Sequence, residues 1–172
     1  MTHPKAPGLA VGVTEPMIRG LVDAFYAKVR VDAVLGPIFN ARIHDWEEHL
    51  AKLADFWSSI VMMSGRYKGR PMPVHVAIPE ISDAHFGRWL ALFAETAAEV
   101  CPPQAAHMFS DRATRIAESL KAGIAIARRE SAAAPRTART PLLARSAAAS
   151  FGHIRLMNRP MSTSAVACSF QP

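Results

Sequence analysis

Two histidines, a tyrosine and a tryptophan have the side-chain types that a buried iron site needs. His49 ends the segment Trp46-Glu47-Glu48-His49, and His75 lies in a stretch bounded by prolines. Tyr26 and Trp89 lie in two other segments that are rich in apolar residues. Imidazole is a common axial ligand of iron, and a phenol or an indole can donate a hydrogen bond inside an apolar slot. Whether these groups converge depends on the elements that carry them.

Apolar residues recur at helical spacing in four long segments, and this predicts an all-α chain. A helix begins after Thr14, a suitable cap, with Pro16 in its first turn, where a missing N–H does no harm. Its apolar positions form one stripe with Tyr26 at the flank. Further helices are expected at about residues 45–63, 83–100 and 104–128, with Ser82 and Asp83 capping the third and a proline pair before the fourth.

His49 falls within the apolar stripe of the second predicted helix. A histidine in such a place is often a core residue whose polar atoms bond a backbone carbonyl or water. Its neighbours on the same face, Leu53, Phe56 and Trp57, make that face wide and aromatic, and a face of this kind can cover a flat apolar ligand. A thick contact between two helices remains the alternative interpretation.

His75 lies in a segment that cannot form a long helix, because glycines and prolines interrupt it at positions 65, 69, 71, 73 and 79. At most a short turn is expected there. A lone loop histidine is usually solvated, but Val74, Val76 and Ile78 indicate that the turn is pressed onto the core. An imidazole held in this way can bind a metal with one nitrogen, while the other needs an acceptor such as a backbone carbonyl of the same segment. No role is assigned to the other five histidines: His3, His44, His85, His107 and His153.

The charge is unevenly distributed along the 172 residues, whose formal net charge is +6. Residues 131–172 hold five arginines and no acidic residue, so the rest of the chain is nearly neutral. A neutral body argues against a nucleic-acid or anionic-membrane surface, which needs clustered positive charge. We expect a flexible segment at 1–13, one domain at 14–130, and a low-complexity Ala/Ser/Arg-rich tail at 131–172 that is disordered.

The cysteines and the hydropathy indicate the compartment. Cys101 and Cys168 are the two cysteines of the sequence, too few for the disulfide framework of a small secreted domain. No segment approaches the roughly 18 apolar residues of a membrane span, and the N-terminus lacks a signal-peptide pattern. A cytoplasmic protein without membrane contact is therefore expected.

Several motifs, in this order and spacing, resemble the group III truncated haemoglobins, which are bacterial globins. The match covers about residues 15–128 and rests on Phe25-Tyr26, Leu35-Gly36-Pro37-Ile38-Phe39, Trp46-Glu47-Glu48-His49, Phe56-Trp57, Tyr67-Lys68-Gly69, His75 and Trp89-Leu90-Ala91-Leu92-Phe93. No single motif is very specific, but together they are. The arginine-rich tail departs from the family pattern.

The resemblance implies a shortened globin fold in which two helices lie over two others around a haem pocket. His75 corresponds to the proximal iron ligand, and Tyr26, His49 and Trp89 correspond to the polar distal pocket, where they stabilise the bound ligand. Haem contacts are expected from Phe39, His49, Leu53, Phe56, Trp57, Tyr67, His75 and Trp89. The haem is expected to be haem b, iron protoporphyrin IX, because the sequence has no Cys-x-x-Cys-His attachment motif.

Three functions are consistent with these residues. The first is a globin that reversibly binds oxygen, and nitric oxide as well, at a five-coordinate iron facing the polar pocket. The second is an enzyme, either a nitric oxide dioxygenase or a peroxidase-like haem protein, that depends on an external reductase because no Gly-x-Gly-x-x-Gly motif indicates a cofactor domain of its own. The third is a cofactor-free helical interaction module.

Overall fold

The computed structural model describes residues 3–133, and in this part of the chain all regular structure is helical. The all-α prediction is therefore confirmed. The helices are α1 (Pro7–Ala10), α2 (Glu15–Val31), α3 (Gly36–Asn40), α4 (Trp46–Val61), α5 (Pro71–Val76), α6 (Asp83–Val100) and α7 (Pro103–Ala133). Within residues 3–133 none of these helices is long and apolar enough to cross a membrane.

Local signals place the beginnings of the long helices. Thr14 Oγ1 accepts a hydrogen bond from the Met17 amide at 3.3 Å, and Asp45 Oδ1 accepts one from the Glu48 amide at 2.9 Å. Both residues thereby satisfy amides that lack a partner within the helix. Helix α6 has the predicted bounds, whereas α7 runs five residues beyond its predicted end, to Ala133.

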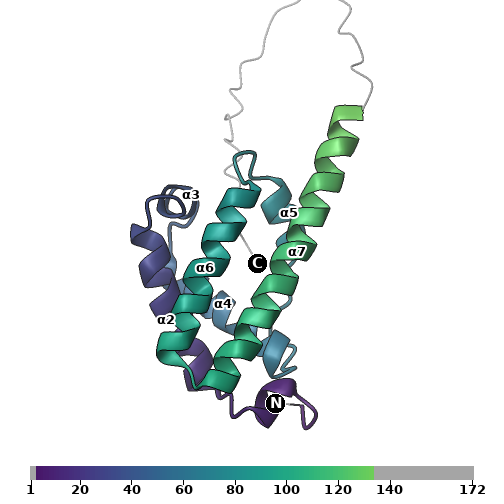
Figure 1. Cartoon of the computed structure of the whole chain (residues 1–172). Coiled ribbons are helices and arrows are strands. Elements are labelled where there is room, and N and C mark those ends of the chain that lie inside the picture. The colour runs from purple at the N-terminus through teal and green to yellow at the C-terminus, as the bar shows by residue number, and fades with distance from the viewer. Residues whose placement is uncertain (1–2, 134–172) are drawn as a thin grey trace, which may run out of the picture.

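Two pairs of long helices, α2 with α4 and α6 with α7, form the body (Figure 1). Helix α6 packs against both α7 and α2, and α2 also packs against α4. Aromatic rings fill the space between them: Trp57 is stacked on Phe93 with centroids 4.9 Å apart, and Phe109 meets Trp57 edge-on at 5.7 Å. Burying such rings supplies most of the hydrophobic stabilisation of a small core.

Of the three short helices, α3 and α5 lie between long helices and carry Phe39 and His75 of the predicted site. Helix α3 begins after Asp32, whose carboxylate accepts hydrogen bonds from the amides of Val34 and Leu35 and from Arg88 of α6. These interactions hold the pKa of Asp32 below its usual range, chiefly through the bond from Arg88. The corner that carries Phe39 is thus fastened to α6.

Helix α5 depends on its neighbours, because none of its six residues is fully buried. It is longer than the short turn that the sequence predicts. It packs against α7, where the absent side chain of Gly123 leaves room for the Met72 thioether to lie directly on the helix. The position of His75 is therefore set by α7 as well as by its own prolines.

Helical structure extends past the predicted domain limits, residues 14 and 130, at both ends. Residues 7–10 form a short helix, and Ala6 and Val13 are buried, so this part of the expected flexible N-terminus packs on the body. Helix α7 includes residues 131–133. The prediction for the rest of the tail lies outside the described residues.

Candidate functional site

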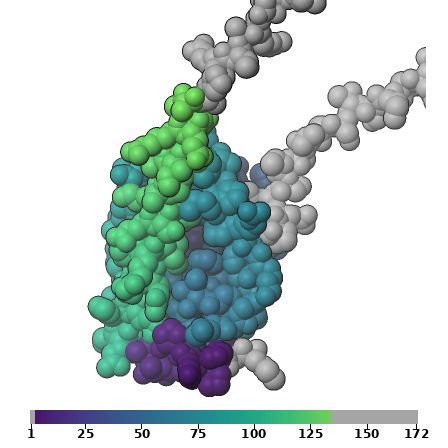
Figure 2. All heavy atoms as spheres, turned by 90° about the vertical axis from the view of Figure 1, so that its right-hand side faces the viewer, coloured from purple at the N-terminus to yellow at the C-terminus, as the bar shows by residue number. Residues whose placement is uncertain are grey.

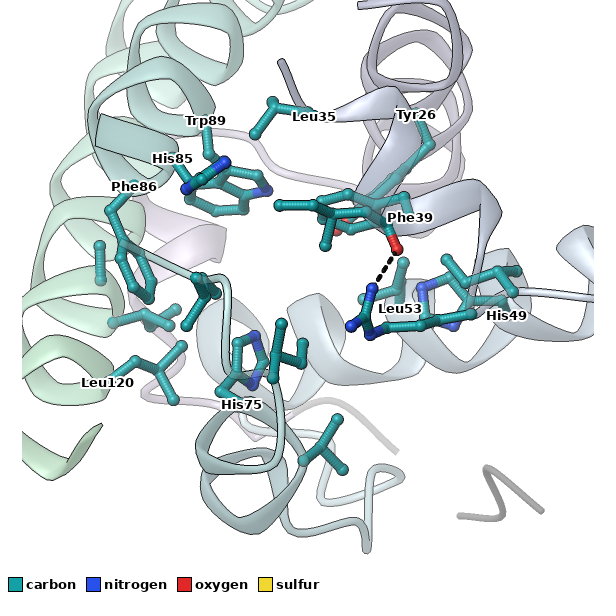
Figure 3. A pocket seen from close by; sticks show the side chains of 18 of the residues that line it. Tyr26, Leu35, Phe39, His49, Leu53, His75, His85, Phe86, Trp89 and Leu120 are labelled. Carbon is teal, nitrogen blue, oxygen red and sulfur yellow. Dashed lines mark hydrogen bonds between the residues drawn. The ribbon is translucent and has the colours of Figure 1, made fainter. Parts of the chain in front are cut away.

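A cavity lies between the two helix pairs, and every residue predicted to contact haem lines it. It is seen from close by in Figure 3, and Figure 2 shows a hollow beside α7 on the face turned toward the viewer. These residues are Phe39, His49, Leu53, Phe56, Trp57, Tyr67, His75 and Trp89, and Tyr26, predicted to stabilise the bound ligand, lines the cavity as well. The tertiary structure thus brings together side chains from α2, α3, α4, α5, α6 and the segment before α5.

His75 enters the cavity from α5, on the side opposite Trp89 and Tyr26 (Figure 3). Its Nδ1 lies 2.8 Å from the carbonyl oxygen of Pro71, one helical turn earlier. A carbonyl only accepts, so this contact requires the proton on Nδ1 and leaves Nε2 with a free lone pair. The expected backbone acceptor in the same segment is confirmed, and the imidazole has the tautomer that a metal ligand requires.

Tyr26 and Trp89 form the polar part of the opposite wall. The Tyr26 side chain is 4% exposed, and its burial raises the pKa of the phenol, an effect that the nearby Trp89 indole partly offsets. The phenol is therefore protonated at all physiological pH values. Both side chains line the cavity, with the Trp89 indole close enough to the Tyr26 oxygen to interact with it, so a ligand bound there has two hydrogen-bond donors beside it.

His49 lies beside Tyr26, with ring centroids 6.0 Å apart in an edge-on arrangement. Burial, together with the nearby positive charge of Lys52, lowers the pKa of His49 to about 4. The imidazole is therefore neutral at pH 7, and can both donate and accept a hydrogen bond.

We expect an NMR titration of His49 to show its step near pH 4 rather than at the ordinary 6.5. Because the folded protein resists protonation here and the unfolded chain does not, the stability of the fold rises with pH between about 4 and 6.5 and is constant in this respect above that range. A His49 step near 6.5 would contradict the buried environment.

Aromatic and aliphatic side chains form the remaining wall. Phe56 meets Tyr67 edge-on with centroids 5.2 Å apart, and burial raises the pKa of the Tyr67 phenol. Trp57 is 2% exposed and stacked on Phe93, so most of its ring belongs to the core and only an edge reaches the cavity. Trp57 therefore belongs to the core and lines the predicted site at the same time.

The cavity also includes residues that the sequence analysis missed. His85, to which no role was assigned, lines it, and its Nδ1 accepts a hydrogen bond from the Ser82 amide at 3.2 Å. The signal was present, because His85 lies one turn before Trp89 on the same helix face. Further lining residues are Leu35, Ile38, Arg42, Ile43, Val74, Ile78, Ile81, Phe86, Ile116, Ala117 and Leu120.

Arg42 is the charged member of this missed group. It donates to the Ile38 carbonyl at 3.0 Å (dashed line in Figure 3) and forms an ion pair with Glu80. The pair joins the end of α3 to the segment between α5 and α6, at the edge of the cavity.

Within residues 3–133 no group of three or more His, Cys, Asp or Glu side chains could hold a bare metal ion.

Comparison with known proteins identifies the family. No protein-family model matches the chain. It is 36% identical over 109 residues to a group 3 truncated haemoglobin, ctb, of Campylobacter jejuni, covering 61% of this chain and 86% of that protein. The crystal structure of a group III truncated haemoglobin from Campylobacter jejuni superposes with a TM-score of 0.62 at 31% identity, covering 72% of this chain and 95% of the other. That of a group II truncated haemoglobin from Bacillus anthracis gives 0.58 at 25% identity, covering 69% and 92%. The chain belongs to the group III truncated haemoglobin family.

Proposed function

We propose that this globin binds haem b in the described cavity, with His75 as the iron ligand, and reversibly binds oxygen and nitric oxide on the side of Tyr26 and Trp89. One observation carries the proposal. An imidazole with its proton on Nδ1 and two hydrogen-bond donors, Tyr26 and Trp89, face each other across one cavity with mostly apolar walls. The membership of the family, whose relatives are named haemoglobins, supports the same cofactor.

The residues present suit an iron porphyrin. Phe39, Leu53 and Phe56 offer apolar surface to the faces and edge of a flat macrocycle, as buried ligand sites generally do. His75 can supply its Nε2 lone pair, since Nδ1 is occupied by Pro71. His85 lies beside Trp89 on the other side of the cavity, and its Nδ1 accepts from the Ser82 amide, so a neutral imidazole there carries its proton on Nε2 and has no lone pair left for iron.

Each side chain of the opposite wall has a definite part in ligand binding. Haem, when bound, supplies a ferrous iron with one open coordination position for a diatomic gas. Tyr26 O–H and Trp89 N–H can donate to that gas molecule, and the apolar walls exclude the water that would compete for both donors. Each such hydrogen bond contributes about 1–3 kcal/mol in a dry pocket. His49, neutral at pH 7, can add a third donor or exchange between the cavity and solvent.

Absorption spectra of the purified protein in the ferric, ferrous and carbonylated states test the proposal. A Soret band with histidine-type spectra and one open position supports it, and the absence of any Soret band after reconstitution would refute it. A nitric oxide dioxygenase would in addition turn over when the oxygenated protein is mixed with nitric oxide and a reductase. Accumulation of ferric protein that the reductase cannot restore would limit the function to binding.

A further inference from the structure

Arg128 lies on the part of α7 that extends beyond the core. The last buried residue of this helix is Ile124, and residues 128–133 are exposed. The Arg128 Nη2 atom nevertheless lies within hydrogen-bond distance of three backbone carbonyl oxygens: 2.8 Å from Ile81, 3.1 Å from Pro79 and 3.4 Å from Ile78. Because this nitrogen carries two hydrogens, the two shorter contacts are the strong ones and the third is shared.

The three carbonyls belong to the segment that joins α5 to α6, and this segment is directly connected to His75. The Ile78 amide donates to the His75 carbonyl at 3.1 Å, and the Ile81 amide donates to the Ile78 carbonyl at 3.4 Å. Ile78 and Ile81 also line the cavity. A displacement of this segment would therefore move the backbone that carries the imidazole.

The other contacts that hold helix α5 in position are only partly buried. None of its residues is fully buried, and it rests on α7 through partly buried side chains such as Met72 and Val76. On the other side of the segment, Arg42 holds only the exposed Glu80 carboxylate. The bonds from Arg128 are made by a charged donor to backbone oxygens, a stronger class than neutral hydrogen bonds.

We infer that Arg128 is a positioning residue for His75: by clamping the segment 78–81 to α7, it sets the position of the imidazole and slows the loss of haem. The inference rests on the proposed function for its effect on haem, but the clamp itself is a property of the polypeptide.

The test uses the full-length protein with Arg128→Ala, Arg128→Lys and, as the matched control, Arg129→Ala, which removes the adjacent exposed charge. Hydrogen exchange is measured at the amides of Ile78 and Ile81 and, as an internal reference, at Phe93 in the core. Haem release is measured by transfer to excess apomyoglobin, and the iron–histidine stretching band by resonance Raman spectroscopy of the ferrous protein.

Arg128→Ala should raise exchange at Ile78 and Ile81, and the haem release rate, by roughly tenfold, the equivalent of about 1.4 kcal/mol. Phe93 exchange should not change, the iron–histidine band should shift or broaden, and Arg128→Lys should restore part of each effect.

Unchanged exchange at Ile78, or an equal effect of Arg129→Ala, would overturn the inference. Faster exchange with unchanged haem release and an unchanged band would overturn it as well. A chain that never takes up haem would refute the proposed function, while the exchange measurement would still decide whether the clamp exists.

Discussion

His75→Ala is expected to abolish stable haem retention. The imidazole is the one side chain on its side of the cavity with a ring nitrogen left free, because the Pro71 carbonyl accepts from Nδ1 and directs Nε2 away from the backbone. Alanine removes the iron ligand and leaves a space beside the apolar wall, so haem would be held by hydrophobic contact alone. The measurement is the ratio of Soret to protein absorbance after reconstitution and gel filtration, together with the rate of haem transfer to apomyoglobin.

His85→Ala is the matched control for that experiment. It removes another imidazole that lines the same cavity, but one whose Nδ1 is engaged at the start of α6 by Ser82. Loss of this helix-end interaction should cost about 1 kcal/mol of stability, within the usual range for caps, and should leave haem stoichiometric. Stoichiometric, histidine-ligated haem in His75→Ala would refute the assignment of His75, and its loss only in His85→Ala would transfer the assignment to that residue.

Tyr26→Phe is expected to raise the oxygen dissociation rate by at least roughly tenfold, the equivalent of one lost hydrogen bond of about 1.4 kcal/mol. The substitution keeps the ring, which meets Phe25 edge-on with centroids 4.8 Å apart and contacts Phe39 at 5.8 Å, so the packing of α2 should survive. Only the hydroxyl is removed, and burial keeps that hydroxyl protonated, and thus a donor, in the wild type. The rate is measured by stopped-flow replacement of oxygen with carbon monoxide.

Tyr67→Phe provides the comparison for the phenol. Tyr67 also lines the cavity, but it lies among the residues of the apolar wall against Phe56. Removing its hydroxyl should leave the oxygen dissociation rate within about twofold of the wild type, since no hydrogen bond to the gas molecule is lost. An unchanged rate in Tyr26→Phe, or equal increases in both variants, would remove Tyr26 from the proposed role.

Helix positions and the side-chain inventory of the site could be predicted because both depend on residues close in sequence. A cap such as Thr14 or Asp45 bonds an amide three residues later, and an apolar stripe repeats every three or four residues, so both can be recognised in a short window. The motif resemblance then supplied the one long-range statement, that the helices carrying His49 and Trp89 face the segment carrying His75, and the cavity lining agrees with it.

The amino-acid sequence by itself thus determined the four long helices, the family, and nine of the residues that line the cavity. Only the tertiary structure decided how His75 is supported and which further residues border the site. Arg128 bonds a carbonyl 47 residues away, and Arg42 pairs with a carboxylate 38 residues away. Contacts of that separation arise from the packing of whole helices against one another, and no local pattern of spacing encodes them.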